Sequence, residues 1–281
     1  MIPLNVRQIL RRHNLWPKKQ LGQNFLEDDG ALEKVVAAAE IAPDDTVLEI
    51  GPGLGSLTRH LAQAARRVVA VEIDAALLPP LKETLRPHAN VDVILADILQ
   101  LDLARVERLA PGYLVVANIP YYITSAIVRH LVEAPVAPAR MVLTVQREVA
   151  ERMVAQPDDM NLLAVSVQFY TVARVVARLP AGAFYPRPEV DSAVVRLDIR
   201  PTPAVSVPVI DDFFRVVKAG FSQKRKQLRN ALAGGLQLEP PQADALLAAA
   251  QLAPQRRAET LTLAEWGALA GAWHQRNGAP A

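Results

Sequence analysis

One four-residue pattern combines groups that could act on a flat aromatic amine: Asn118-Ile119-Pro120-Tyr121. The side-chain carbonyl of Asn118 and the backbone carbonyl of Ile119 offer two acceptors for the N–H bonds of an exocyclic amine. An amine held in this way keeps its lone pair on the nitrogen instead of delocalising it into the ring. Pro120 fixes the turn, and Tyr121 can stack on the ring. The pattern indicates group transfer to a base amine, although such a turn also occurs in ordinary loops.

A glycine-rich turn, in the sequence EIGPGLGS, follows a short apolar run. Gly51, Gly53 and Gly55 remove side chains where a ligand can approach the backbone, at the carboxyl end of a strand. Dinucleotide-binding proteins begin in the same way, but they place a third glycine where this chain has Ser56. Glu49 precedes the turn, and its carboxylate suits a free ammonium better than a pyrophosphate. The turn therefore favours a ligand with an amino-acid moiety.

Two further acids end the next two apolar runs. Glu72 could accept hydrogen bonds from both hydroxyls of a ribose, and Asp97 could accept one from the exocyclic amine of adenine. With Glu49, three acids converge on one cleft, and together they predict S-adenosylmethionine as the cofactor. Its methyl sulfonium is an electrophile that an amine held by Asn118 can attack without a general base. This chemistry suits a chain with no histidine near the motif.

These groups need an α/β framework to position them. Apolar runs predict buried strands, and amphipathic runs between them predict helices. The strands are expected at 46–50, 68–73, 91–96, 113–117 and 141–145, and the helices at 31–40, 56–65 and 75–85. This alternation predicts a parallel sheet covered on both faces. Ser56 is the expected N-cap of the second helix.

The later sequence predicts a second, smaller domain. Valine-rich residues 162–178 and 190–199 could extend the sheet at one edge. Residues 200–209 contain three prolines and indicate a linker, and residues 210–278 have helical spacing. We therefore expect a cofactor-binding domain at 1–204 and a small all-helical domain at 205–281.

Composition excludes several classes of protein. The 281 residues are 51% hydrophobic and 21% charged, which is globular and too apolar for disorder. Cysteine is absent, so disulfides, thiolate zinc sites and cysteine nucleophiles are excluded. The five histidines lack metal-ligand spacing, so no metal is expected. No apolar stretch reaches the ~18–20 residues of a membrane span, and no secretory signal is recognisable. A cytoplasmic protein without a membrane anchor is expected.

The distribution of charge is more informative than its sum. Lys and Arg number 31 against 29 Asp and Glu, a net charge of +2. Residues 1–24 and residues 215–230 nevertheless contain several basic residues and no acid. Two such runs favour binding to a polyanion, although each could also be a solvated helix face.

At this point the sequence resembles a known family, the rRNA adenine N6,N6-dimethyltransferases of the bacterial KsgA type and their eukaryotic counterparts. The resemblance covers residues 18–235 and rests on the segments KKQLGQNFL, EIGPGLGSLT, VEID, ADIL, NIPYYITS, FYPRPEVDS and FSQKRKQLRN. It implies a Rossmann-like methyltransferase domain with a small helical C-terminal domain. It also implies dimethylation of two adjacent adenosines in the 3′-terminal hairpin loop of small-subunit (16S) rRNA, in a pre-30S particle late in ribosome biogenesis. We expect the protein to act as a monomer.

The resemblance also implies roles for individual residues. Contacts to S-adenosylmethionine are expected from Asn24, Leu26, Gly51, Glu72, Asp97 and Asn118, with Gln23, Glu49 and Gly53 as close neighbours. The catalytic turn is expected to be completed by an aromatic residue opposite Tyr121, namely Phe184. RNA contacts are expected from Arg11, Arg12, Lys18, Lys19, Lys224, Arg225, Lys226 and Arg229. One departure is Met160-Asn161, where many members have Tyr-Gly. The segment 23–26 is predicted to close over the methionine end of the cofactor.

Three alternatives remain open from the sequence. Macrolide-resistance methyltransferases share the fold and act on large-subunit rRNA, but they usually have a polar residue at the position of Leu54 and lack the segment at 184–192. A non-catalytic RNA-binding factor could be built on a decayed methyltransferase, although Glu72, Asp97 and the motif at Asn118 are intact. An NAD-dependent dehydrogenase is disfavoured by that same motif and by Ser56.

Overall fold

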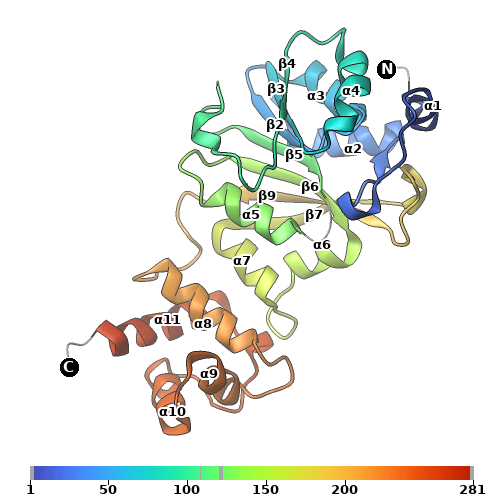
Figure 1. Ribbon diagram of the computed structural model, residues 1–281. Coiled ribbons are helices and arrows are strands. Elements are labelled where there is room, and N and C mark those ends of the chain that lie inside the picture. The colour runs from blue at the N-terminus through green and yellow to red at the C-terminus, as the bar shows by residue number, and fades with distance from the viewer. Residues whose placement is uncertain (1–2, 108, 120–122, 279–281) are drawn as a thin grey trace. The chain divides into compact units, whose positions relative to one another are not determined.

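The computed structural model describes residues 3–107, 109–119 and 123–278 (Figure 1). The chain forms two compact units, and it passes between them more than once. The first unit comprises Met1–Glu151 and Val172–Ile199, and we call it the sheet unit. The second comprises Arg152–Thr171 and Arg200–Ala281, and we call it the helical unit.

A seven-stranded sheet, with the order β4-β3-β2-β5-β6-β9-β7, forms the centre of the sheet unit. Strands β2 to β6 pair in parallel, and β9 pairs antiparallel with β6. The strands are β2 (Thr46–Ile50), β3 (Arg67–Glu72), β4 (Val91–Leu95), β5 (Leu114–Asn118), β6 (Arg140–Gln146), β7 (Thr171–Leu179) and β9 (Ser192–Ile199). All five predicted strands are present within about one residue of the expected ends. The expected parallel sheet is thus confirmed for these strands, with an antiparallel addition at one edge.

The three predicted helices are present, and two further helices follow β5 and β6. They are α2 (Asp29–Ala39), α3 (Ser56–Ala64), α4 (Leu78–Leu85), α5 (Thr124–Val132) and α6 (Arg147–Met153). Ser56 is not the N-cap of α3, because Gly55 takes that place with φ of 88° and Ser56 is the first helical residue. The loop needs a left-handed residue there, and a serine is poorly suited to that conformation.

The N-terminal segment packs on the sheet unit. It contains α1 (Val6–Arg12), a 3₁₀ turn at Lys19–Leu21 and the short strand β1 (Phe25–Leu26). Strand β1 pairs antiparallel with β8 (Phe184–Tyr185), so two segments far apart in sequence lie side by side. Helix α1 buries Val6, Ile9 and Leu10 in an apolar cluster.

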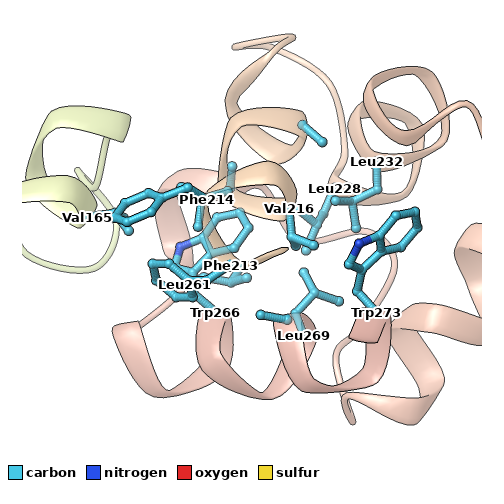
Figure 2. Packing of buried hydrophobic residues seen from close by; sticks show 14 of the residues in the cluster. Val165, Phe213, Phe214, Val216, Leu228, Leu232, Leu261, Trp266, Leu269 and Trp273 are labelled. Carbon is cyan, nitrogen blue, oxygen red and sulfur yellow. The ribbon is translucent and has the colours of Figure 1, made fainter. Parts of the chain in front are cut away.

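The helical unit contains α7 (Leu162–Tyr170), α8 (Ile210–Phe221), α9 (Leu228–Leu236), α10 (Pro240–Ala249) and α11 (Leu263–Gly278). Its core is built around Phe213 and the fully buried Trp266 (Figure 2). Phe169 of α7 stacks on Phe213, with ring centroids 4.5 Å apart. The expected linker at 200–209 contains neither helix nor strand.

Helix α7 is a correction to the sequence interpretation. The sequence predicts that residues 162–170 extend the sheet, but they form a helix, and only Thr171–Leu179 form a strand. The segment is valine-rich, so it has strand propensity, yet its buried side chains complete a helical core. The structure also divides the chain differently from the expected boundary between 204 and 205, because 152–171 and 200–204 belong to the helical unit.

Within the described residues, no helix has both the length and the apolar content that crossing a membrane would require.

Candidate active site

A cavity lies where the order of the sheet strands reverses. The chain continues from β2 to β3 and β4 on one side, and β5 and β6 lie on the other side of β2. Ligands of open α/β sheets bind at the carboxyl ends of strands at such a point. In the pairing of β2 with β5, Ile50 lies opposite Ala117, so the glycine-rich turn and Asn118 begin side by side.

All nine residues that the sequence predicted as cofactor contacts line this one cavity. They come from the N-terminal segment, the glycine-rich turn and the ends of β2, β3, β4 and β5. They are Gln23, Asn24, Leu26, Glu49, Gly51, Gly53, Glu72, Asp97 and Asn118. The wall also contains apolar side chains suited to a planar base, among them the exposed Ile73 and the buried Ile98. The arrangement fits the predicted ligand, and the assignment of each contact stays a prediction.

The glycine-rich turn has a backbone that side chains would disturb. Gly53 has φ of 60°, and a Cβ at this position would lie 3.0 Å from ring carbons of Phe25. The turn therefore needs glycine for its conformation and also for close packing against the N-terminal segment.

Glu72 has a second role that sequence reasoning missed. Its Oε2 accepts a hydrogen bond from the Gly53 N–H at 3.0 Å, and its Oε1 accepts one from the Asp74 N–H at 2.9 Å. Burial raises the pKa of this carboxyl, and the backbone hydrogen bonds oppose the rise. Each carboxylate oxygen has a further lone pair, so Glu72 can hold the turn and still accept ribose hydroxyls.

Glu49 is a buried carboxyl in the cavity wall. It is 1% exposed, and its Oε2 has no hydrogen-bond partner among the residues that the structure describes. Burial raises the pKa of Glu49 to about 8, and the negative charge of Glu72 adds to the rise. The carboxyl is therefore mostly protonated at neutral pH, and a cation bound beside it would favour the ionised form.

Asp97 follows β4 and is half-buried. Its Oδ1 accepts a hydrogen bond from the Leu99 N–H at 3.0 Å, which orients the carboxylate at the strand end. The side chain lines the cavity together with Ala96 and Ile98, as expected for a group that contacts a planar base.

Asn118 is held by the N-terminal segment. Its Nδ2 donates a hydrogen bond to the backbone carbonyl of Asn24, at 2.9 Å. A backbone carbonyl can only accept, so the amide must present its NH2 group to this segment. The side-chain carbonyl of Asn118 consequently lies on the opposite side of the amide. Ile119 also lines the cavity, whereas Pro120 and Tyr121 lie outside the described residues.

Phe184 is not among the described residues that line the cavity. Phe184 is 3% exposed and packs in the apolar core of the sheet unit. In the β1–β8 pair it lies opposite Leu26, which belongs to the same core. Its predicted contact with a target base stays a prediction. The Arg7 guanidinium lies over the ring of the next residue, Tyr185, at 4.7 Å from its centroid.

The predicted RNA contacts fall into two groups. In the N-terminal segment, Arg11 and Lys19 are exposed. Arg12 forms an ion pair with Glu83 at 2.9 Å. Lys18 forms one with Asp74 at 2.8 Å.

In the helical unit, the helical spacing expected over residues 210–278 fails at three of the four predicted RNA contacts, and the contacts themselves stay a prediction. The turn between α8 and α9 exposes Lys224, Arg225 and Lys226. Helix α8 ends at Phe221 and α9 starts only at Leu228, so these residues lie between the two helices. Arg229 lies on α9 and forms an ion pair with Asp244 at 2.8 Å.

Asp74 is a further residue to which sequence reasoning gave no role. Its side chain is 5% exposed and connects β3 to residues 18–26, which we call the N-terminal strap. Its only sequence signal is a second acid two positions after Glu72, in a segment that carries part of the family resemblance.

Known proteins are similar to this chain over most of its length. A family model described as ribosomal RNA adenine dimethylase matches residues 15–269. A ribosomal RNA small subunit methyltransferase A from Dehalococcoides mccartyi is 46% identical over 261 residues, which is 92% of this chain and 89% of that protein. The protein of the same name from Moorella thermoacetica is also 46% identical, covering 93% of this chain and 94% of its own.

Two solved structures share the fold over most of the chain. The 23S rRNA methyltransferase ErmE superposes with a TM-score of 0.69 at 30% identity, covering 90% of this chain and 100% of that one. A dimethyladenosine transferase from Plasmodium falciparum has a TM-score of 0.74 at 24% identity and covers 90% and 98%, respectively. The sheet order and the match over residues 15–269 confirm the resemblance found in the sequence. The chain belongs to the family of ribosomal RNA adenine dimethylases.

Proposed function

We propose that this protein binds S-adenosylmethionine in the cavity and dimethylates N6 of two adjacent adenosines in the 3′-terminal hairpin loop of small-subunit (16S) rRNA. The proposed substrate is a pre-30S particle late in ribosome biogenesis, and the proposed state is a cytoplasmic monomer. The relatives at 46% identity support the small-subunit target, because their name specifies that subunit. The single observation that carries the chemistry is the fixed amide of Asn118 beside the glycine-rich turn.

The cavity fits this cofactor in two respects. Glu49 has a buried oxygen without a partner among the described residues, which suits the ammonium of an amino-acid moiety. The backbone at Gly53 carries no side chain that would block a ligand, and Glu72 stands beside it. When bound, S-adenosylmethionine supplies an electrophilic methyl group on a sulfonium.

The residues of the chain would then hold the acceptor. The Asn118 side-chain carbonyl and the Ile119 backbone carbonyl accept the two N–H bonds of the adenine amine, which keeps its lone pair available. Such preorganised acceptors stabilise the positive charge that develops on the amine during transfer. Among the described residues, no histidine lines the cavity, and this chemistry requires no base before the transfer.

A methylation assay on subunits tests the proposal. Small subunits from cells that lack the dimethyladenosines are incubated with purified protein and methyl-labelled S-adenosylmethionine, and primer extension locates the modified bases. We expect two adjacent stops near the 3′ end and four methyl groups per subunit. Large subunits serve as the control. Label on large-subunit rRNA only would overturn the proposal and favour an activity on 23S rRNA, the RNA for which ErmE is named.

A further inference from the structure

We propose that Asp74 is a positioning residue that fastens the N-terminal strap, and that the strap in turn orients the amide of Asn118. The inference rests on the proposed methyl transfer, since the amide matters only if it holds the acceptor amine. It gives Lys18 and Gln23 a role different from the RNA and cofactor contacts expected of them.

The first step is the fastening itself. Asp74 Oδ1 accepts a hydrogen bond from Lys18 Nζ at 2.8 Å, and Oδ2 accepts one from Gln23 Nε2 at 2.9 Å. Gln23 Oε1 in turn accepts from the Lys18 N–H at 2.8 Å. Both oxygens of one nearly buried carboxylate are therefore used to hold two residues of the strap.

The electrostatics show that this carboxylate stays charged. Burial alone would raise the pKa of Asp74, but the hydrogen bonds from Lys18, Gln23 and the Ala76 N–H outweigh it and hold the pKa below its usual value. Glu72 accepts one hydrogen bond from the Asp74 N–H and another from the Gly53 N–H. Hydrogen bonds therefore link Asp74 to the glycine-rich turn.

The second step leads from the strap to the catalytic amide. Asn24 follows Gln23 directly, and its carbonyl accepts the hydrogen bond from Asn118 Nδ2 at 2.9 Å. If Lys18 and Gln23 lose Asp74, this carbonyl is no longer fixed, and the amide can rotate so that its NH2 group faces the acceptor amine. An NH2 group cannot accept an N–H bond, so the rotated state is inactive.

The strap has a separate anchor on its other side. Phe25 and Leu26 pair with Tyr185 and Phe184 in the β1–β8 pair, and Phe25 packs against Gly53. Loss of Asp74 should therefore loosen residues 18–24 and leave β1 in place. For this reason we expect an effect on the rate that exceeds the effect on folding or on cofactor affinity.

Single-turnover methylation at saturating cofactor and subunit tests the inference, with Asp74→Asn, Lys18→Met and Lys18→Arg. Asp74→Asn should lower the rate on the order of 10–100-fold, as small misplacements of catalytic groups do. Lys18→Met should lower the rate less. Lys18→Arg should retain most of the wild-type rate, because the ion pair with Asp74 is kept. Glu83→Gln is the matched control: it removes the acid of another ion pair of the N-terminal segment, the one with Arg12, and should leave the rate within about twofold.

A double-variant comparison separates positioning from general damage. If Asp74 acts through Asn118, then Asp74→Asn should have no further effect on the rate of Asn118→Ala, whereas independent structural effects would multiply. Thermal melts and calorimetric cofactor affinity are measured on the same samples. A wild-type rate in Asp74→Asn, or multiplicative losses in the double variant, would overturn the inference. Absence of methylation by the wild-type protein would instead contradict the proposed function.

Discussion

The two acid-free basic runs of the sequence, residues 1–24 and 215–230, meet different surroundings in the folded protein. In the first run, Arg12 and Lys18 pair with Glu83 and Asp74, which lie far along the chain. In the second run, Arg229 also pairs with an acid, Asp244, but Lys224, Arg225 and Lys226 lie exposed in a turn. A similar local charge pattern therefore accompanies a fastened segment in one place and an open basic turn in the other.

The difference shows what a local count of charges can and cannot predict. Whether a lysine is available to phosphate depends on the acids that the fold brings to it, and those acids are distant in sequence. Lys18 lies beside a nearly buried carboxylate, so part of its charge is already neutralised. We therefore expect the N-terminal run to act mainly on the active site and the C-terminal run mainly on RNA affinity.

Truncation should have the largest effect. Removal of residues 1–26 takes away part of the cavity wall, so we expect loss of measurable cofactor binding by calorimetry. Removal of residues 1–17 leaves the strap intact and should keep cofactor binding, with lower stability because α1 no longer covers its apolar cluster. Full cofactor affinity after removal of residues 1–26 would show that this segment is not part of the active site. The expected difference between the two basic runs would then be wrong.

Asn118→Ala should have the next largest effect, because the N-terminal segment is expected to act through this amide. Loss of one acceptor aimed at developing charge typically lowers the rate by ~10²–10³. Cofactor affinity should change much less, and the melting temperature should stay near that of the wild type. The measurement is single-turnover methylation at saturating cofactor. A wild-type rate would mean that the amide does not hold the amine.

Replacement of Lys224, Arg225 and Lys226 by Ala should reduce RNA affinity without changing the modified base. Each phosphate interaction that is removed should lower the log–log slope of affinity against salt by roughly 0.7–0.9. Interactions with phosphate carry no sequence information directly, so the same adenosines should be methylated. An unchanged slope would show that this exposed turn is only a solvated surface, and the contrast with the N-terminal run would disappear.

Arg12→Ala should have the smallest effect. Its ion pair with Glu83 is about half exposed, and such pairs contribute less than about 1 kcal/mol to the free energy of unfolding. The salt slope should change by less than the roughly 0.7–0.9 expected for one phosphate interaction, because the guanidinium is already paired. Chemical denaturation and salt-dependent RNA binding measure the two quantities. A decrease of the slope by that full amount would return Arg12 to the RNA-binding residues.

The sequence was sufficient for the parts of the site that lie at strand ends. Periodic apolar runs located β2 to β6, and the residues just after them, such as Asp97 and Asn118, line the cavity because parallel strands end at one edge. It was insufficient where distant segments meet. The role of Asp74 depends on Lys18, and Phe184 packs in the core because β8 pairs with β1.

Helix α7 illustrates a second limit. Its valines favour a strand when considered alone, and only the helices of the later sequence provide the core that they enter. In α7, tertiary context outweighed local propensity. Ser56 shows a local limit instead, because the left-handed Gly55 takes the capping position.

The passage of the chain between the two units has a consequence for synthesis and for exchange of modules. Helix α7 leaves the ribosome before α8 to α11, yet Val165 (Figure 2) and Phe169 belong to their core. The helical unit therefore cannot complete folding until the later helices emerge. The sheet likewise cannot be completed before β9 has been synthesised. A fragment that begins at residue 205 would carry α8 to α11 without α7. It would lack Phe169, which stacks on Phe213, so exchange of this fragment alone would not keep that contact.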